Sequence, residues 1–517
     1  MLMPPRSLIT SIERRWLLIA SIVVLMLASL PYAFGALSSN SDWIFTGLQV
    51  NPLDGVSYLA KMRIGFNGGW LFHLPFSIEQ GPGAYLFTFF IALGHLARIL
   101  NLPLIVMFHL VRIIGGFSLL WLIYELIARF TEPIDRRRRV WWIVALSSGL
   151  GWLASLLGHT QSSDLSIPES NTFYSLIANA HFALAAAIMI SIFIGVLDAQ
   201  KFSIKRVIGL SLLSLLLAVI QPFAPFAVYA ILGATLIAIW YRDRLFPWSK
   251  FFSTFIAGLA TGPLLLYMYL ATQADPTLQQ WSIQNQTPSP PLIDYAIGYG
   301  LLIAGAIIGI RSVWPRRSNW DILLIVWIVV AIPLLYAPIP LQRRLSLGLH
   351  IPIAILAAYG IDRLIQAKWR KRLAIAATCL TSFFLLVVLI GGAVKHDPHI
   401  YLSANEAAAF NWLAANAQPN DIILASPDLS LFVPAFTDQR VVYGHPYESV
   451  NADRRKKQVT DFYSGQIDPA TLLRADSVAY VLVGPRERAL GQIDPAALPL
   501  NLVFTLGDVS VYQVTLK

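Results

Sequence analysis

Charged residues and cysteine are both scarce in this sequence. Asp, Glu, Lys and Arg make up only 13% of the 517 residues, roughly half the fraction of a typical soluble domain. The single cysteine, Cys379, lies inside an apolar run, which excludes a disulfide framework and a cysteine-based metal site. The sequence also lacks a glycine-rich phosphate loop of the Walker or Gly-x-Gly-x-x-Gly type. A Rossmann site for a soluble nucleotide is therefore not predicted.

Long apolar runs dominate the sequence instead. Apolar residues make up 56% of the chain, and the mean hydropathy is +0.62. Runs of about 20 apolar residues recur, which is the length that crosses a bilayer as a helix. We predict a mainly α-helical, polytopic membrane protein with about eleven transmembrane helices. The expected spans are 17–36, 103–130, 140–157, 173–197, 207–220, 222–241, 251–271, 292–311, 320–338, 344–362 and 373–392.

Basic residues indicate the orientation of these spans. Basic clusters fall on alternate connections, at 136–139, 201–206, 242–250, 311–317 and 368–372, whereas 158–172 and 272–291 contain no Lys or Arg. Because Lys and Arg are enriched on the cytoplasmic side, we predict a multi-pass protein of the cell inner membrane with a cytoplasmic N-terminus and an extracytoplasmic tail. The net charge of +10 is then a topology signal, and no nucleic-acid partner is predicted.

Two long segments lie outside the predicted spans. In the first outer loop, 37–102, residues 83–100 must not cross the membrane if the charge pattern is to hold. They are predicted to form an amphipathic helix in the outer interface, with a second one over 56–66. The tail alternates short buried strands with helices, which is typical of an α/β domain. Its expected strands are 422–425, 441–443 and 478–483, followed by a hairpin over 503–514. We therefore predict a membrane domain over 1–394 and a small extracytoplasmic α/β domain over 395–517.

Asp54 is the acidic residue of greatest interest on the predicted outer face. It follows the first span, in a chain with only 28 Asp and Glu residues. A carboxylate in this place can act as a general base towards a bound hydroxyl group. The alternative is a turn or helix-capping residue, because Asp54 precedes Gly55 and Asp-Gly is a common turn dipeptide.

A cationic pair and two further polar residues are also candidates. Arg343 and Arg344 lie on the outer side, against the positive-inside pattern; they are interpreted as a phosphate clamp, with interfacial snorkelling as the alternative. Glu169 follows Pro168 and is either part of the site or an acid that starts a helix. His181 lies near the outer end of a span, where a polar residue is a functional candidate or a satisfied buried side chain.

The remaining outer polar residues carry weaker signals. His159, Asp164 and His181 do not have the spacing of a metal site, so neither a metal nor another cofactor is predicted. His445 and Glu448 lie in a turn-rich loop of the tail and are interpreted as residues that dock the tail onto the membrane part.

The order of these features resembles the GT-C superfamily of membrane glycosyltransferases, which includes the protein O-mannosyltransferases and the aminoarabinose transferases that modify lipid A. A first span is followed by a long outer loop with an acidic residue, here Asp54 in the pattern Asp-Gly-x-x-Tyr. An interfacial helix and a span with an early arginine, here Arg112, come next. A second outer acid follows, Asp164 or Glu169, and an Arg-Arg pair marks a late span before the extracytoplasmic domain.

The sequence departs from the family pattern in two places. The paired acids often found in the first loop are reduced to Asp54 alone, between Leu53 and Gly55. The His-Pro-Pro that opens the interfacial helix of the mannosyltransferases is absent, and residues 81–83 read Gly-Pro-Gly instead. The resemblance therefore leaves the sugar and the acceptor open.

The resemblance implies a transferase that moves a sugar, with inversion, from a polyprenyl-phosphate donor to an extracytoplasmic acceptor. The acceptor is a hydroxyl group of a glycan, a lipid or a protein, and membrane lipids surround the enzyme. The implied site residues are Asp54 and Glu169 for catalysis and Tyr58, His181, Arg343 and Arg344 for substrate binding. In this scheme Asp54 is the base and the arginines stabilise the leaving phosphate.

Two other classes of protein are alternatives. A secondary transporter would carry ionisable residues at the middle of the bilayer, often in broken helices, whereas the polar residues here lie at the outer rim. A non-catalytic membrane assembly protein of the cell envelope would use its outer domain to recruit a partner, and its outer polar residues need not gather in one site.

Overall fold

The chain divides into two compact units, each built from segments distant in sequence. The computed structural model describes residues 8–515. Unit 1 holds the described part of Met1–Pro31 with His109–Leu266 and Thr287–Ile390, and unit 2 holds Tyr32–Phe108, Tyr267–Gln286 and the described part of Gly391–Lys517. One unit boundary lies close to the domain boundary predicted at 394. The first outer loop groups with the tail, whereas the sequence-based division assigned it to the membrane domain.

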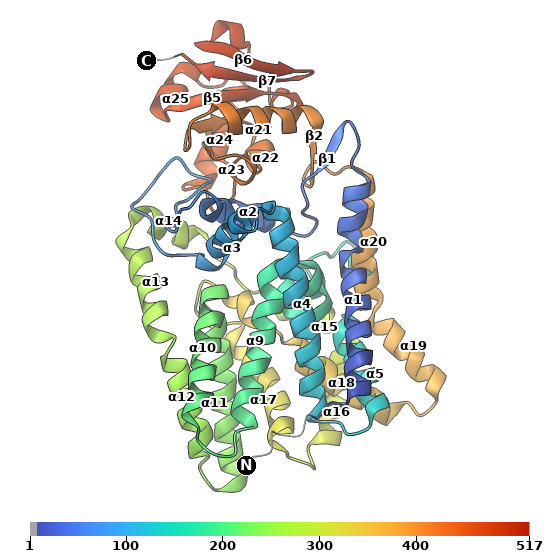
Figure 1. Cartoon of the computed structure of the whole chain (residues 1–517). Coiled ribbons are helices and arrows are strands. Elements are labelled where there is room, and N and C mark those ends of the chain that lie inside the picture. The colour runs from blue at the N-terminus through green and yellow to red at the C-terminus, as the bar shows by residue number, and fades with distance from the viewer. Residues whose placement is uncertain (1–7, 516–517) are drawn as a thin grey trace. The chain divides into compact units, whose positions relative to one another are not determined.

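Unit 1 is a bundle of helices, in which α9, α10, α11 and α17 pack on one another (Figure 1). Its elements are α5 (Ile134–Leu146), α6 (Gly151–Leu156), α7 (Ser163–Ser166), η1 (Pro168–Ser170), α8 (Thr172–Ile177), α9 (Ala180–Leu197), α10 (Ile204–Ile220), α11 (Ala224–Asp243), α12 (Trp248–Leu259), α15 (Leu292–Tyr299), α16 (Leu301–Val313), α17 (Asn319–Leu334), η2 (Gln342–Ser346), α18 (His350–Leu364) and α19 (Lys368–Thr378). Four helices contain a unit boundary: α1 (Ser11–Leu37), α4 (Leu104–Ala128), α13 (Gly262–Ala274) and α20 (Leu380–Val394).

The long apolar helices make this a multi-pass membrane protein. Among residues 8–515, five helices are long and apolar enough to cross a membrane, and counting each of two bent helix pairs as one span raises the number to seven. The eleven spans predicted are therefore not confirmed, because several of the apolar runs form shorter helices. α10 has 17 residues and α17 has 16, at the short end of the range of about 17–25 residues that crosses a bilayer.

Breaks in the helices also reduce the number of continuous spans. The break predicted at Gln221 is confirmed, since α10 ends at Ile220 and α11 begins at Ala224. A second break, which the sequence did not predict, separates α15 from α16 with a bend of 78°. It lies at Gly300, whose φ of 45° is a conformation that glycine adopts without strain.

Glycine residues allow α16 and α18 to approach closely. A Cβ atom on Gly309 would lie 1.9 Å from the carbonyl oxygen of Leu356, and one on Gly360 would lie 2.0 Å from that of Gly305. No side chain fits at these distances. Small residues at helix interfaces are the usual way in which membrane helices reach close contact, so these glycines determine the packing of the two helices.

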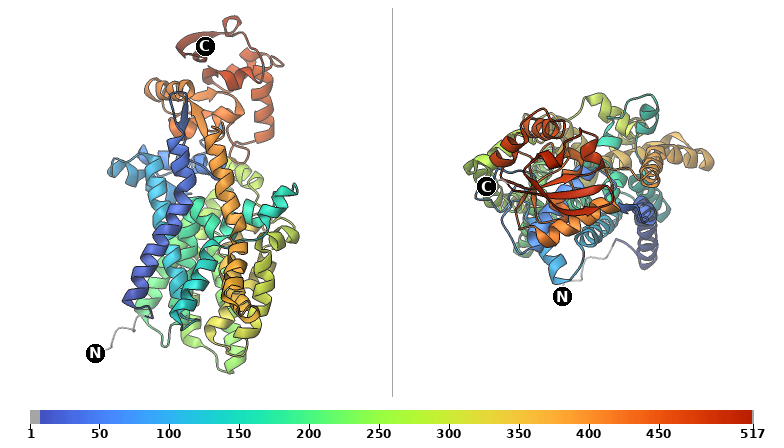
Figure 2. Two further views of the ribbon diagram at one scale, coloured as in Figure 1. Left: turned by 90° about the vertical axis from the view of Figure 1, so that its right-hand side faces the viewer. Right: turned by 90° about the horizontal axis from the view of Figure 1, so that it is seen from above.

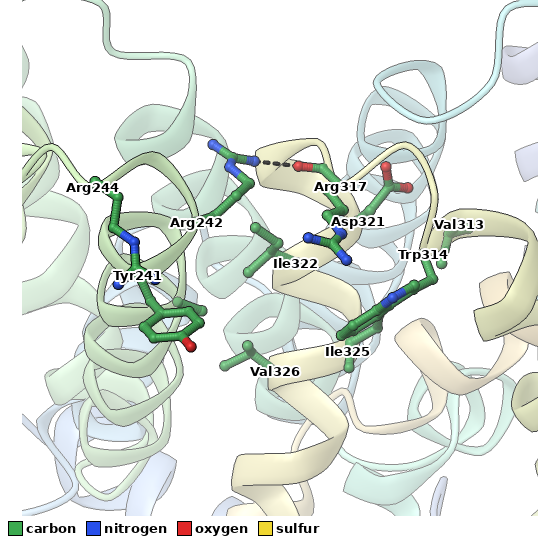
Figure 3. Close-up of a pocket in the computed structure, with 11 residues that line it drawn as sticks. Tyr241, Arg242, Arg244, Val313, Trp314, Arg317, Asp321, Ile322, Ile325 and Val326 are labelled. Atoms are coloured by element: carbon green, nitrogen blue, oxygen red, sulfur yellow. Dashed lines mark hydrogen bonds between the residues drawn. The ribbon is translucent and has the colours of Figure 1, made fainter.

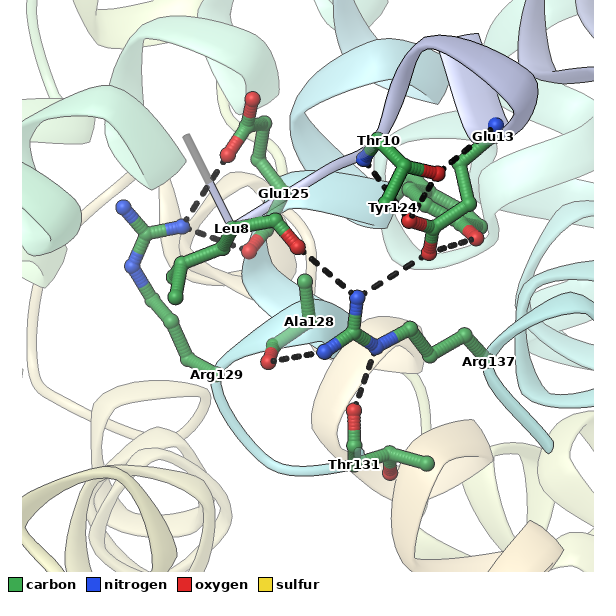
Figure 4. Close-up of polar contacts among 9 residues, drawn as sticks. All are labelled: Leu8, Thr10, Glu13, Tyr124, Glu125, Ala128, Arg129, Thr131 and Arg137. Carbon is green, nitrogen blue, oxygen red and sulfur yellow. Dashed lines mark hydrogen bonds and ion pairs between the residues drawn. The ribbon is translucent and has the colours of Figure 1, made fainter. Parts of the chain in front are cut away.

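A buried polar network joins α1, α4 and α5. Nη1 of Arg137 lies 3.0 Å from Oε1 of Glu13, and the Tyr124 hydroxyl donates a hydrogen bond of 2.8 Å to the same oxygen (Figure 4). Arg137 also donates to three backbone carbonyl groups. Glu13 is fully buried, so the network satisfies two charges that would be costly to bury apart.

Unit 2 begins with the helices of the first loop. α2 (Pro52–Phe66) and α3 (Thr88–Ile99) pack on each other and occupy the segments where interfacial helices are predicted. With 12 residues, α3 is about 18 Å long, which is too short to cross a bilayer. A short strand, β1 (Trp43–Phe45), pairs antiparallel with β2 (Tyr401–Ser403), so the first loop and the tail share a two-stranded sheet.

The tail forms a five-stranded sheet in the order β4-β3-β5-β7-β6. Figure 1 labels β5, β6 and β7, and Figure 2 shows the strands of the tail as red arrows. β3, β4 and β5 are parallel, and β6 and β7 form an antiparallel hairpin. Strands overlap the predicted segments 422–425 and 478–483 and the predicted hairpin over 503–514, whereas of the predicted segment 441–443 only residue 441 lies in a strand, β4. The remaining elements of unit 2 are α14 (Pro276–Gln284), α21 (Ala404–Asn416), β3 (Ile422–Leu424), α22 (Pro427–Ser430), α23 (Val433–Phe436), β4 (Arg440–Val441), α24 (Ala452–Tyr463), α25 (Pro469–Ala475), β5 (Val478–Val483), α26 (Pro485–Arg488), η3 (Pro495–Ala497), β6 (Leu500–Leu506) and β7 (Val509–Val514).

Helices cover both faces of this sheet. Trp412 on α21 packs against Tyr480 of β5, with ring centroids 5.9 Å apart. Val481 points to the opposite face, because successive side chains of a strand alternate, and belongs to a core with Val459 and Phe462 of α24. The central strand β5 thus lies buried between α21 and α24, whereas β6 at the edge of the sheet is largely exposed.

Candidate active site

Asp54 lies in the first turn of α2, beside Asn51. Asn51 has a φ of 45°, and its Nδ2 donates a hydrogen bond of 2.6 Å to Oδ2 of Asp54. The helix dipole stabilises a carboxylate in a first turn. Asp54 is nevertheless partly exposed, so its carboxylate is accessible to a ligand. The role of Asp54 as a base stays a prediction.

Lys61 and Glu448 form a buried ion pair within unit 2. Nζ of Lys61 lies 2.7 Å from Oε1 of Glu448, with the two side chains only 1% and 8% exposed. The Ser57 hydroxyl donates to the same oxygen, and the Lys61 ammonium group lies 4.2 Å from the centre of the Phe87 ring. Glu448 therefore anchors the tail to α2 of the first loop.

The pKa values of Glu448 and His445 reflect this burial. Burial alone would raise the pKa of Glu448, but the charge of Lys61, the nearby His445 and hydrogen bonds from Lys61 and Ser57 hold it below its usual value. Burial lowers the pKa of His445, against the opposing charges of Glu448 and Asp54. The backbone N–H groups of residues 447 and 448 donate to Nδ1 of His445, so the neutral ring carries its proton on Nε2.

Tyr58, predicted to bind substrate, packs between the helices of the first loop. Its ring is buried and stacks on Phe90 of α3, with centroids 4.2 Å apart and an interplanar angle of 8°. This contact fixes α2 against α3. A role of Tyr58 in substrate binding stays a prediction.

In unit 1, the structure brings together Glu169 and Arg344, two residues that the sequence analysis proposed for the site. Glu169 lies on η1 and Arg344 on η2, with Nη1 of the arginine 3.7 Å from Oε1 of the glutamate. Both side chains are largely buried: that of Arg344 is 15% exposed and that of Glu169 is 4% exposed. The backbone N–H of Gly348 also donates to the carbonyl of Glu169 at 3.0 Å. The ion pair and this hydrogen bond hold η1 against η2.

Other candidate residues lie on elements that pack around this pair. His181 is buried in the first turn of α9, which contacts η1. The Arg344 guanidinium group lies 5.6 Å from the centre of the Phe223 ring. Gln221, two residues earlier, is 1% exposed, and neither atom of its side-chain amide has a hydrogen-bond partner among residues 8–515. A buried amide without a partner in the protein is rare, so both amide atoms of Gln221 are available to a polar group.

Arg343 differs from Arg344 in its surroundings. Its backbone N–H donates to the Thr287 carbonyl at 3.2 Å, and its side chain is half-buried. Within residues 8–515 it forms no ion pair. Its role as a phosphate ligand stays a prediction.

Asp164 and Arg112 have structural partners. Asp164 is buried and accepts hydrogen bonds from Ser148 and from the backbone N–H groups of Gly149 and Gly151, at 3.1–3.2 Å. Burial raises the pKa of its carboxyl group. Arg112 donates to the carbonyl of residue 176 and to the hydroxyl of residue 29. Both side chains thus connect segments of unit 1.

Two of the acid–base pairs that the structure contains, and that the sequence did not reveal, involve residues on the predicted outer face. One is Lys61–Glu448, and the other joins His159 to the buried Asp294. The partners are far apart in sequence and no local motif links them, so the only available signal was the rarity of acids. No group of three His, Cys, Asp or Glu residues in the described part of the chain is placed to hold a metal ion.

The fold was compared with known proteins. No family model matches the sequence, and no curated protein matches it either. Solved structures do match: ArnT from Cupriavidus metallidurans bound to undecaprenyl phosphate has a TM-score of 0.53 at 11% identity, covering 95% of this chain and 98% of ArnT. The chain has the GT-C fold.

Two further structures with this fold agree. The Archaeoglobus fulgidus oligosaccharyltransferase in the apo form gives a TM-score of 0.53 at 11% identity, covering 92% of this chain and 70% of that enzyme. The arabinofuranosyltransferase AftD from Mycobacteria gives 0.51 at 13% identity, covering 98% of this chain and 40% of AftD. The GT-C resemblance inferred from the sequence is thereby confirmed at the level of the fold.

Proposed function

We propose that this protein is a membrane glycosyltransferase that uses a polyprenyl-phosphate-linked sugar. The acceptor hydroxyl oxygen attacks the anomeric carbon of the sugar on the face opposite the phosphate. A new C–O bond forms as the bond from the anomeric carbon to the phosphate oxygen breaks, and the electron pair leaves with the polyprenyl phosphate. The acceptor proton passes to a base, and the anomeric configuration inverts.

The observation that carries this proposal is the GT-C fold over almost the whole chain. ArnT, which is similar over 95% of this chain, was solved with undecaprenyl phosphate bound. A polyprenyl carrier suits a chain with many apolar helices and no nucleotide-binding loop, because the lipid tail can lie among the helices while its head group is presented at their ends.

Arg344 is the residue we assign to the phosphate. A guanidinium group stabilises the charge that develops on a leaving phosphate. At 3.7 Å, Glu169 is within ion-pair range but beyond hydrogen-bond range, so it orients the arginine electrostatically. We therefore assign Glu169 to positioning Arg344. We assign His181 and the Gln221 amide, which has no hydrogen-bond partner among residues 8–515, to binding polar groups of the donor.

Asp54 is the residue we assign as the base. Its partly exposed carboxylate is held in one orientation by Asn51. A general base must reach the acceptor hydroxyl within hydrogen-bond distance, and a carboxylate on the first turn of a helix is a fixed acceptor for that proton.

The proposal is tested by mass spectrometry of cell-envelope glycans and lipids in a deletion strain complemented with variants. The wild type should restore the missing sugar, and Asp54→Asn should not, because an amide cannot accept the proton. Asp42→Asn is the matched control, since Asp42 is an exposed acid on the same loop. Restoration by Asp54→Asn at the wild-type level would refute its role as base.

Donor binding is measured separately on the purified protein. Undecaprenyl phosphate binding, followed by native mass spectrometry, should weaken in Arg344→Gln and weaken less in Arg344→Lys, which keeps the charge but not the planar fork. Unchanged binding in Arg344→Gln would remove Arg344 from the phosphate site. A deletion strain with no change in any sugar of the envelope would refute the transferase itself.

A further inference from the structure

Unit 1 contains a cavity that is separate from the residues assigned to sugar transfer. It has a volume of about 430 Å³ and lies between the end of α11, the connection from α16 to α17, and the first turns of α17 (Figure 3). Its walls combine arginines and aromatic rings at one end with aliphatic side chains along α17. This combination suits an amphiphilic ligand with an anionic head.

Two arginines at this cavity are available to a ligand. Arg244 lies over the ring of Tyr241, 4.4 Å from its centroid, and Arg317 lies over the ring of Trp314 at 5.3 Å. Within residues 8–515 neither arginine forms an ion pair. An aromatic face orients a guanidinium group without neutralising it, so both retain their full charge and their hydrogen-bond donors.

A third arginine gives the cavity its shape. Arg242 donates to the backbone carbonyl of Arg317 (Figure 3). It also donates to Oδ1 of Asn319, and it is paired with Asp243. These bonds tie the end of α11 to the start of α17. The cavity is therefore bounded by specific contacts between α11 and α17.

Asp321, the one carboxylate that residues 8–515 contribute to the lining, does not oppose an anion. Oδ1 of Asp321 lies 2.6 Å from Nη2 of Arg316, and Oδ2 caps the start of α17 through Ser318. Its charge is thus already neutralised. Below it, Ile322, Ile325 and Val326 form an apolar surface on α17.

We propose that this cavity binds an anionic glycerophospholipid. Its phosphate lies between Arg244 and Arg317, and an acyl chain follows the apolar surface of α17. Tyr and Trp are enriched at the head-group level of membranes, which matches the position of Tyr241 and Trp314 beside the arginines. Each arginine that contacts the anionic head group adds a comparable increment of attraction. The basic connections at this end of the bundle are also those predicted to face the cytoplasm.

The test is native mass spectrometry of the full-length purified protein with phosphatidylglycerol or phosphatidylcholine added. We expect preferential retention of phosphatidylglycerol. Its affinity should fall about 5-fold in Arg244→Gln or Arg317→Gln and about 30-fold in the double variant, as the loss of one head-group contact for each arginine predicts. Arg311→Gln is the matched control, because Arg311 is an exposed arginine at the end of α16 that does not line the cavity. It should retain wild-type affinity.

A second variant tests the apolar part without changing charge. Val326→Trp should fill the cavity and reduce phosphatidylglycerol retention while both arginines remain. Inorganic phosphate alone should not displace the lipid, because it makes no contact with the apolar surface. Any of three results would overturn the proposal. The first is a double arginine variant whose preference for phosphatidylglycerol stays within 2-fold of the wild type. The others are an effect of Arg311→Gln equal to that of the double variant, and displacement of the lipid by inorganic phosphate.

Discussion

The buried Lys61–Glu448 pair provides a sharp test of how unit 2 is held together. We consider Glu448→Gln, which removes one charge and keeps the size of the side chain. Lys61 is 1% exposed, so its ammonium group would remain buried without a counter-ion. Breaking a buried ion pair in this way costs about 3–5 kcal/mol. Because about 1.4 kcal/mol corresponds to a tenfold change in an equilibrium, local opening should become roughly two to three and a half orders of magnitude more frequent.

Hydrogen exchange measured by mass spectrometry reports this opening directly. Peptides covering α2 and the 443–450 loop should exchange faster in Glu448→Gln, while peptides from unit 1 should be unchanged. Asp438→Asn is the matched control. It breaks the Arg63–Asp438 pair, whose side chains are 24% and 32% exposed, and a pair that reaches solvent contributes only about 0–1 kcal/mol.

The pH dependence has a defined sign. The pKa of Glu448 is lower in the folded protein than its usual value of 4.5, so the pair's contribution is fully present above that value. It is lost as the pH falls through the folded pKa, because the carboxyl group then takes up a proton. After correction for intrinsic exchange rates, acid should accelerate exchange in the wild type, and Glu448→Gln should lack this component.

Two results would refute the reasoning. The first is acceleration by Glu448→Gln no greater than that by Asp438→Asn. The second concerns the double variant Lys61→Met, Glu448→Leu, which removes both charges and should recover much of the stability, since an apolar pair of similar volume is often neutral or stabilising. A double variant as unstable as both single variants combined would show that the two residues do not act as a pair.

Three further predictions concern unit 1. Gly309→Ala should lower the melting temperature of the protein in detergent, because the added methyl group would meet a carbonyl oxygen of α18. The control is Gly209→Ala, which should be neutral or slightly stabilising because Gly209 has open space around it. Equal melting temperatures of the two variants would contradict the close packing. Glu13→Gln should lower the free energy of unfolding by about 3–5 kcal/mol, because it leaves a buried arginine without its counter-ion. Denaturant unfolding measures this change. A decrease below about 1 kcal/mol would contradict the network in Figure 4. Burial raises the pKa of Asp164, so the contribution of Asp164 to stability is present below its usual pKa and lost as the pH rises through the folded pKa. Asp164→Asn should remove this pH dependence from thermal melts measured over a series of pH values. An unchanged pH profile would assign the dependence to another group.

Local patterns made several features predictable. The break at Gln221 follows from a proline that cannot continue a helix, and the strands of the tail follow from short runs of β-branched and aromatic residues. The number of spans was less predictable. An apolar run such as 292–311 has the composition of one straight helix, but its path bends by 78° at Gly300, and packing determines which glycines become breaks.

For the candidate site, the sequence predicted the types of residue better than it predicted which residues pair with one another. Glu169 and Arg344 were both candidates, but their sequence environments did not reveal that they form an ion pair. Glu448 was predicted to dock the tail, and in the structure it contacts α2 of the first loop. Its partner, Lys61, is 387 positions away in the sequence, so no local pattern linked the two residues. Asp54 and Tyr58 lie one helical turn apart on α2, and the structure distinguishes the partly exposed carboxylate from the buried ring.

The sequence by itself determined the class of the protein, the breaks made by proline and the strands of the tail, because hydrophobic length and periodicity are properties of neighbouring residues. The order of motifs along the chain also indicated the GT-C fold. Only the tertiary structure decided which glycines pack α16 against α18, which acids are neutralised by distant bases, and where arginines stand beside an unfilled cavity. These features depend on which segments meet in space, and a buried charge or a close helix contact is specified jointly by residues that are far apart in the chain.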